Sequence, residues 1–249
     1  DGFVGRNGAF EKAVRAIERL DDAGLTVLVK SNVVRCNAEE IHALKALFAA
    51  RPRIHFMADV LLHGRDDGAS TLSERATPEQ IVGYFAQEMN AAPQAEIDAL
   101  ARQLDAVPEH SSYETLRPCG AGRTFASIQP NGDVLSCTHL VSKPLGNLRT
   151  ERFSALWLSS PETRALRALT VARFEECKGC EFRHVCAKCP ALSLHESGRL
   201  EGHSRQVCDR TKAFWGAVKT RLGRAPLPVL EAPPVVSRHA LRVIPAERA

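Results

Sequence analysis

Eight cysteines occur in this chain, and all but one lie in a single stretch from residue 119 to residue 208. The seven clustered residues are Cys119, Cys137, Cys177, Cys180, Cys186, Cys189 and Cys208. No signal-peptide pattern is visible, so we expect a cytoplasmic protein whose thiols stay reduced. Reduced cysteines at such close spacing favour metal binding over a disulfide framework.

The densest part of the cluster is a double Cys-x-x-Cys pattern. Cys177 with Cys180 and Cys186 with Cys189 form two pairs that are separated by five residues. Each pair places two thiolates on one tight turn, and thiolates prefer zinc and iron–sulfur clusters. One zinc ion takes four ligands and leaves three cysteines over, whereas a 4Fe–4S cluster tolerates an iron without a cysteine. The ligand count favours two clusters, and a zinc-binding structural domain stays open as the alternative.

The outlying cysteines extend this pattern in a specific way. Cys119 is followed after twelve residues by Gly132 and after four more by Cys137, and eighteen residues separate Cys189 from Cys208. Over about residues 117–212 this arrangement resembles the SPASM domain, the auxiliary-cluster extension of radical S-adenosylmethionine (SAM) enzymes such as peptide maturases and anaerobic sulfatase maturases. One departure is the gap of two residues before Cys189, where the common pattern has three.

The resemblance implies a division of the seven cysteines between two auxiliary 4Fe–4S clusters. Cys119, Cys137 and Cys189 would hold auxiliary cluster I, and Cys177, Cys180, Cys186 and Cys208 would hold auxiliary cluster II. Some relatives have a further cysteine soon after the first one, but none occurs here between residues 120 and 128. Cluster I should therefore have an open iron or a non-cysteine ligand, for which His139, His195 and His203 are candidates.

The N-terminal part alternates helical and strand patterns. Apolar spacing predicts a helix over residues 8–23. A β-branched, mostly apolar run predicts a strand over 25–30 that is buried on both faces of a parallel sheet, and residues 54–60 are expected to form the next strand. A capping pattern at Asn37 predicts a second helix, and Thr77-Pro78 predicts the start of a third. Helices and strands at this spacing indicate βα units with a parallel sheet.

Residues 1–70 resemble the second half of a radical SAM partial barrel, through Gly5, Gly8 and the helix and strand that follow. The CxxxCxxC motif that binds the SAM-cleaving cluster is absent, and Cys36 has no partner at that spacing. We therefore expect a truncated enzyme that is inactive by itself, with Cys36 as a small core residue. Ser31 and Asn32 follow the first strand and are the candidates for contact with S-adenosylmethionine.

These patterns together predict an α/β fold. Residues 1–107 are expected to form the C-terminal half of a partial (β/α) radical SAM barrel, and residues 108–221 a small cysteine-rich α+β SPASM domain. A β-hairpin is expected around Asn131-Gly132, a surface turn at residues 66–68, and a proline-rich flexible tail over 222–249.

The resemblance implies an oxidoreductase that matures a ribosomally made peptide. The whole parent enzyme would use S-adenosylmethionine and a third 4Fe–4S cluster, while the auxiliary clusters transfer electrons or contact substrate. Its partners would be a peptide or protein substrate, a leader-binding partner, and an electron donor such as flavodoxin or ferredoxin. The alternatives are a sulfatase-maturase-like enzyme and a non-catalytic module that binds clusters or zinc.

Charge and hydropathy disfavour two other classes of partner. The formal net charge is only +4, and no block of lysine and arginine stands out, so nucleic-acid binding has little support. No stretch reaches the ~18 consecutive apolar residues that a membrane-spanning helix needs.

Overall fold

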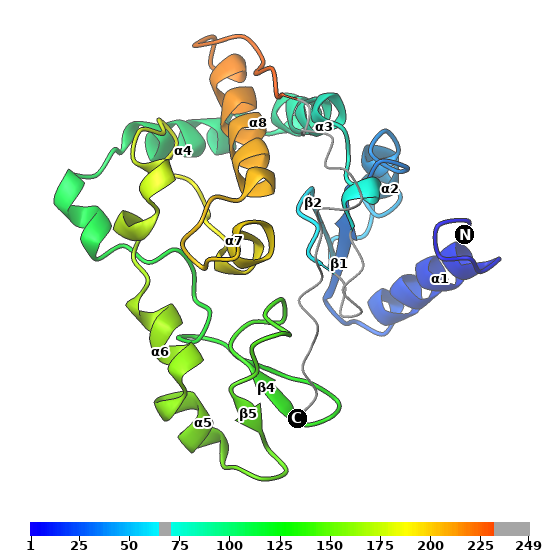
Figure 1. Ribbon diagram of the computed structural model, residues 1–249. Coiled ribbons are helices and arrows are strands. Elements are labelled where there is room, and N and C mark those ends of the chain that lie inside the picture. Colours follow the sequence, from blue (N-terminus) through cyan, green and yellow to red (C-terminus); the bar gives the residue numbers. More distant parts are fainter. Residues whose placement is uncertain (65–70, 232–249) are drawn as a thin grey trace.

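The computed structural model describes residues 1–64 and 71–231 of the chain (Figure 1). The turn predicted at residues 66–68, and residues 232–249 of the predicted tail, lie outside the described part. Within it the chain is a mixed α/β protein with a two-stranded parallel sheet and a three-stranded antiparallel sheet. None of the described helices is both long and apolar enough to cross a membrane.

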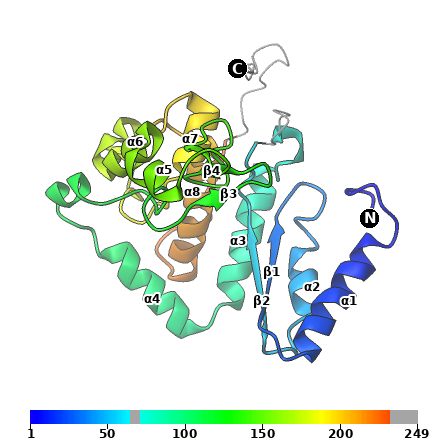
Figure 2. The same ribbon diagram turned by 90° about the horizontal axis from the view of Figure 1, so that it is seen from below.

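The N-terminal elements confirm the predicted alternation. In chain order they are α1 (Ala9–Asp22), β1 (Val27–Asn32), α2 (Ile41–Ala46) and β2 (Ile54–Asp59). β1 pairs with β2 in parallel, so that Asn32 lies opposite Asp59 at the carboxyl ends of both strands (Figure 2). Asn37 does not cap α2: its side-chain oxygen accepts a hydrogen bond from the Val34 amide at 2.8 Å.

The prediction that the strand over residues 25–30 is buried on both faces is wrong. One face of the sheet exposes Leu28 and Met57, with 59% and 53% of their surface accessible. The opposite face is covered, because Phe56 and Ala58 pack against the main core. Burial on both faces requires a layer on each side of a parallel sheet, and the described residues supply only one.

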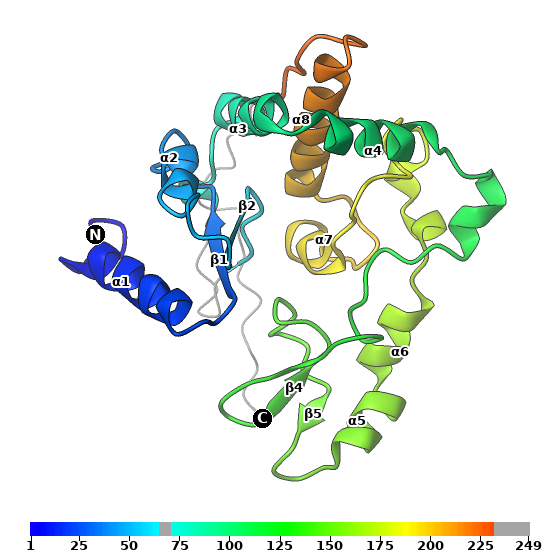
Figure 3. The same ribbon diagram turned by 180° about the vertical axis from the view of Figure 1, so that it is seen from behind.

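A helical layer covers the inner face of the sheet. It contains α3 (Pro78–Ala91), α4 (Gln94–Asp105) and α8 (Arg205–Arg221), and α3 and α8 lie side by side in Figures 1 and 3. The capping box predicted for α3 is present, since Thr77 and Gln80 exchange side-chain to main-chain hydrogen bonds. Phe85 of α3 meets Phe214 of α8 edge-on at 5.5 Å. One hydrophobic core therefore joins segments on both sides of residue 107.

The cysteine-rich part consists of short elements. They are η2 (His110–Glu114), β3 (Ser127–Ile128), β4 (Asp133–Leu135), β5 (Gly146–Asn147), α5 (Phe153–Ser159), α6 (Pro161–Ala168), η3 (Val171–Arg173), η4 (Glu175–Cys177) and α7 (Pro190–Ser197), and a further short helix, η1 (Leu72–Glu74), precedes α3. The predicted hairpin is confirmed as β3 and β4, with Gly132 in the turn at a φ of 94° that favours glycine. β5 adds a third strand that the sequence patterns did not predict.

The residues that follow α8 pack back onto it. Leu230 is buried in the main core, and Pro228 lies directly against Gly216. A side chain at position 216 would bring its Cβ to 2.6 Å from a Pro228 carbon. Residues 222–231, which begin the predicted tail, therefore pack against α8.

Candidate metal centre

Three of the cysteines meet at the start of α7; we call them the three-cysteine group. Cys119 precedes the hairpin, Cys137 follows β4 directly, and Cys189 is the N-cap residue of α7. All three are partly buried and pack against a small apolar cluster that includes Leu140 and Leu166. Segments far apart in the sequence thus supply one patch of thiols.

The electrostatics of these thiols reflect their proximity. Burial raises the pKa of Cys189, the negative charges of Cys137 and Cys119 raise it further, and the main-chain N–H groups of Leu192 and Ala191 oppose the shift. Burial likewise raises the pKa of Cys119, and Cys137 adds to the effect. The three thiols influence one another, as ligands of one site would.

The other four cysteines form a second set, the four-cysteine group. Cys177 ends η4, Cys180 and Cys186 lie in the loop between η4 and α7, and Cys208 lies in the first turn of α8. Burial, followed by the charges of Cys186, Cys177 and Cys180, raises the pKa of Cys208 to about 12. The pKa of Cys177 is also raised by burial and by Cys186 and Cys180, against an opposing effect of Lys188.

The donor chemistry of both groups fits a soft metal centre. All eight cysteines are free thiols. Burial raises the pKa of Cys119, Cys177, Cys189 and Cys208, so a metal that binds them must displace their protons. Four or three thiolates suit iron–sulfur clusters, and four also suit zinc. Within residues 1–64 and 71–231, no three His, Cys, Asp or Glu side chains are gathered as ligands of a single metal ion.

Polar contacts fix the first turn of α8 to the end of β2. Arg75 forms a buried ion pair with Asp209 at 2.9 Å, directly after Cys208. Arg210 binds the Asp59 carboxylate at 3.0 Å, and the Gln206 side chain exchanges two 3.0 Å hydrogen bonds with the main chain of Leu62. These contacts position Cys208 relative to the parallel strands.

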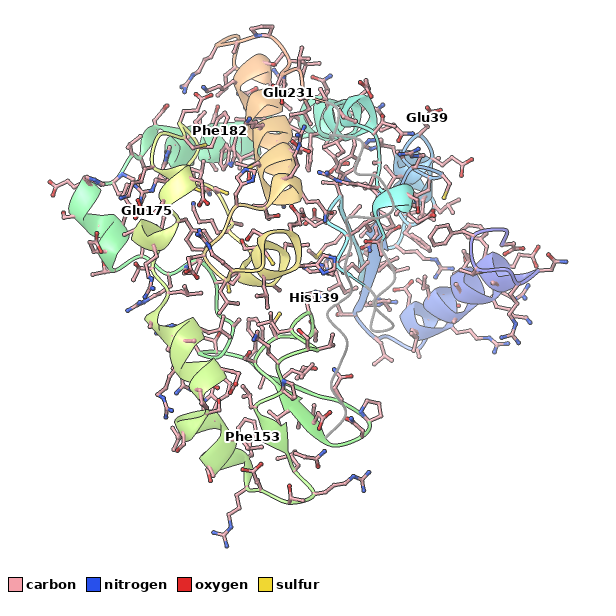
Figure 4. The ribbon with its side chains drawn as sticks, viewed as in Figure 1. Glu39, His139, Phe153, Glu175, Phe182 and Glu231 are labelled. Carbon is pink, nitrogen blue, oxygen red and sulfur yellow. The ribbon has the colours of Figure 1, made fainter. Side chains whose placement is uncertain are left out.

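Histidines lie beside the three-cysteine group, and the most direct contact is one that the sequence analysis missed. His63 Nε2 lies 3.7 Å from Cys189 Sγ, and the His63 ring stacks on His139 with centroids 3.4 Å apart. Burial, together with the nearby charges of His139 and Lys30, lowers the pKa of His63 to about 4, so this ring is neutral. Figure 4 shows His139 between α7 and the strands.

The other two candidate histidines have different surroundings. The His195 ring lies against Gly64, next to His63. His203 Nε2 instead contacts Cys208 Sγ at 3.1 Å, so it belongs with the four-cysteine group and not with cluster I as proposed from sequence. The one sequence signal for His63 was its place after a parallel strand, where such folds often hold ligand groups.

Ser31 and Asn32 end β1, as expected. Ser31 is half-buried opposite Ala58, and Asn32 is exposed opposite Asp59. The charge of the preceding Lys30 lowers the pKa of both His63 and His139, which places this strand end near the three-cysteine group.

Cys36 does not match its prediction. It is exposed, not a core residue, because it lies in the polar turn region between β1 and α2. It therefore stands apart from both cysteine groups in environment as well as in sequence.

Comparison with known proteins agrees with the thiol chemistry. A family model named SPASM, described as an iron-sulfur cluster-binding domain, matches residues 119–181. The cysteine-rich part thus defines an iron–sulfur cluster-binding protein. Three relatives that match most of the chain are two AdoMet-dependent heme synthases and a mycofactocin maturase. These matches confirm the resemblance to the radical SAM SPASM family that is seen in the sequence.

The similarity to these relatives is moderate and extensive. The AdoMet-dependent heme synthase of Nitratidesulfovibrio vulgaris is 28% identical over 80% of this chain, and that of Methanosarcina barkeri is 28% identical over 80%. The mycofactocin maturase MftC of Mycolicibacterium smegmatis is 27% identical over 84%. The chain spans 58%, 60% and 53% of the lengths of these three relatives, respectively.

Proposed function

We propose that this chain carries the auxiliary-cluster region of a radical SAM oxidoreductase and holds two auxiliary 4Fe–4S clusters. The observation that carries the proposal is the division of seven partly buried thiols into a group of three, whose charges act on Cys189, and a group of four, whose charges act on Cys208. The three-cysteine group would hold cluster I, and the four-cysteine group cluster II. When bound, such clusters exchange single electrons at low potential.

The protein's own residues would position these centres differently. The four-cysteine group supplies a complete set of ligands, and Arg75 and Arg210 tie its α8 ligand to the strand end. The three-cysteine group would supply three of the four ligands of a cluster, and the stacked His63 and His139 lie beside this group. A substrate or an imidazole would supply the fourth ligand.

The two parallel strands are evidence for a catalytic barrel beside the cysteine-rich part. We propose that β1 and β2 belong to a partial (β/α) barrel over residues 1–107, followed by the SPASM domain over 108–221 and the tail over 222–249. This proposal is supported by the exposure of Leu28 and Met57 on one face of the sheet, because parallel sheets are ordinarily covered on both faces. Ser31 and Asn32 would then face S-adenosylmethionine beside a third 4Fe–4S cluster of the parent enzyme.

Two substrate classes follow from the names of the relatives. A peptide fits the relationship to the mycofactocin maturase, and flavodoxin or ferredoxin and a leader-binding partner would assist the parent enzyme in the cytoplasm. A tetrapyrrole is the second candidate, because three of the relatives are AdoMet-dependent heme synthases. The electron paramagnetic resonance (EPR) spectrum of cluster I separates the two classes. A peptide or a tetrapyrrole is added to the protein that carries both clusters, and the substrate is the one that changes the spectrum.

Anaerobic reconstitution tests the cluster assignment. We expect a brown protein that binds about eight iron and eight sulfide ions, as two 4Fe–4S clusters require. Replacing the exposed Cys36 by alanine should leave that content unchanged, whereas Cys186→Ala should reduce it by about half. A colourless protein with one or two zinc ions and no sulfide would overturn the proposal.

A further inference from the structure

Three cationic side chains are buried among the residues that the structure describes. They are Arg75, Arg183 and Lys188, with 7%, 5% and 4% of their surface exposed. A buried charge is costly unless an opposite charge compensates it. The partners of these three residues therefore indicate where negative charge is expected.

Arg75 follows the usual rule. Its guanidinium lies 2.9 Å from the Asp209 carboxylate, which is equally buried. This pair shows how the fold compensates a buried cation when a carboxylate is available.

Lys188 and Arg183 depart from that rule. The Lys188 ammonium donates a 2.9 Å hydrogen bond to the Arg183 carbonyl, and the Arg183 guanidinium reaches the Val171 carbonyl at 3.3 Å and lies over the Tyr113 ring. Arg183 Nε has no hydrogen-bond partner. Within the described residues, no carboxylate forms an ion pair with either side chain.

The four-cysteine group supplies the missing negative charge. The Lys188 charge acts on Cys177, where it opposes the effect of burial on the thiol pKa. Lys188 also lies in the short gap between Cys186 and Cys189, at the position where the chain departs from the common SPASM spacing. Four thiolates around a 4Fe–4S core carry net negative charge, which neutral thiols do not.

We propose that Lys188 is the counter-charge of the four-cysteine site and raises the reduction potential of its cluster. The inference rests on the proposed cluster function. Reduction adds one negative charge, and a nearby buried cation stabilises that charge in a low dielectric. The three-cysteine group has the neutral His63 ring and the exposed Lys30 instead.

Redox titrations of reconstituted variants, followed by EPR, test this role. Lys188→Gln keeps a donor for the Arg183 carbonyl but removes the charge, and Lys188→Arg keeps the charge. The matched control is Lys178→Gln, which removes an exposed lysine that is already paired with Glu175 in the same loop. All three variants keep the seven cysteines.

At a fixed applied potential we expect Lys188→Gln to lower the ratio of reduced to oxidised cluster II about tenfold, or about 59 mV for one electron. Lys188→Arg and Lys178→Gln should remain within about twofold of the unmodified protein, because charge is kept in the first and exposed charge is screened in the second. An unchanged potential in Lys188→Gln would overturn the inference, as would an equal shift in the exposed control.

Lys188→Met provides a second test if Lys188→Gln fails to load cluster II. It removes the charge and keeps a long unbranched side chain, so cluster II, assigned with Cys119→Ser and Cys186→Ser, should show the same tenfold loss of the reduced form at a fixed potential. An unchanged potential in Lys188→Met would contradict the counter-charge. If the unmodified protein binds no iron and sulfide, the proposed function itself fails, and the two failures are thereby distinguished.

Discussion

The two cysteine groups differ in how the chain assembles and compensates them. The four-cysteine group takes three cysteines from one short segment and the fourth from α8, and buried cations lie beside it. The three-cysteine group gathers Cys119, Cys137 and Cys189 from distant segments and borders a stack of histidines near the strand ends. A complete, charge-compensated site suits electron storage, while an incomplete site at a strand end suits contact with a substrate.

Removing one ligand from the complete group should have the largest effect. Cys180→Ala should abolish cluster II and unfold the loop around it, because short segments of this kind bury little apolar surface without their metal. We expect the protein to lose about half of its iron, because one of the two 4Fe–4S clusters holds half of it. The thermal midpoint of unfolding should also fall. Iron analysis and calorimetry provide the measurement.

The exposed Cys36 supplies the control for that change. Cys36→Ala removes a thiol outside both groups and should alter neither the iron content nor the thermal midpoint. Full iron content and an unchanged midpoint in Cys180→Ala would contradict the assignment of this cysteine as a ligand.

The ion pair between Arg75 and Asp209 offers the next largest effect. Asp209→Asn leaves the Arg75 charge buried without compensation, and breaking a buried pair typically costs about 3–5 kcal/mol. Because Asp209 follows Cys208 in α8, cluster II should be lost at a lower denaturant concentration than cluster I. Denaturation followed by EPR of each cluster measures this order.

A double replacement sharpens that test. Arg75→Met combined with Asp209→Leu removes both charges and should recover most of the lost stability. Loss of both clusters at the same denaturant concentration in Asp209→Asn would mean that the ion pair stabilises the whole fold and not the four-cysteine site in particular.

The raised pKa of Cys208 predicts a pH effect on the metal-free protein. Its value rises from 9.0 to about 12 through burial first and neighbouring thiols second. Between these values the thiol ionises in the unfolded chain but not in the folded one, so stability is fully present below pH 9 and is lost as pH rises toward 12. Each pH unit in that window should cost at most about 1.4 kcal/mol.

Chemical denaturation at pH 8 and pH 10 measures that loss. Cys208→Ser cannot ionise in this range and should show a smaller difference between the two conditions. A loss of equal size in Cys208→Ser would assign the pH effect to other groups.

The sequence analysis succeeded where the signal was local. The parallel strands, the capping box at Thr77 and the hairpin at Gly132 depend on neighbouring residues, and the structure has all of them. The prediction that the strand over residues 25–30 is buried on both faces was wrong, because burial depends on layers that β-branched runs do not encode. Cys36 was likewise assigned to the core by residue type, although its turn is exposed.

The site shows the same limit. Spacing identified the seven cysteines, but it could not reveal that His63, 126 residues from Cys189 in the sequence, touches its sulfur. The charge environment was also hidden, because Lys188 resembles an ordinary surface lysine until its burial is known. Contacts between distant segments carry this information, and a single sequence does not display them.

The smallest expected effect concerns the histidine contacts, which distinguish the two groups most directly. His63 Nε2 lies 3.7 Å from Cys189 Sγ, and His203 Nε2 lies 3.1 Å from Cys208 Sγ. His63→Ala should alter the EPR spectrum of cluster I alone and cost about 1 kcal/mol or less, the usual net value of one hydrogen bond. His203→Ala should alter cluster II alone. A change in the opposite cluster, or in both clusters after either replacement, would mean that the two groups are not the separate sites that their thiol chemistry indicates.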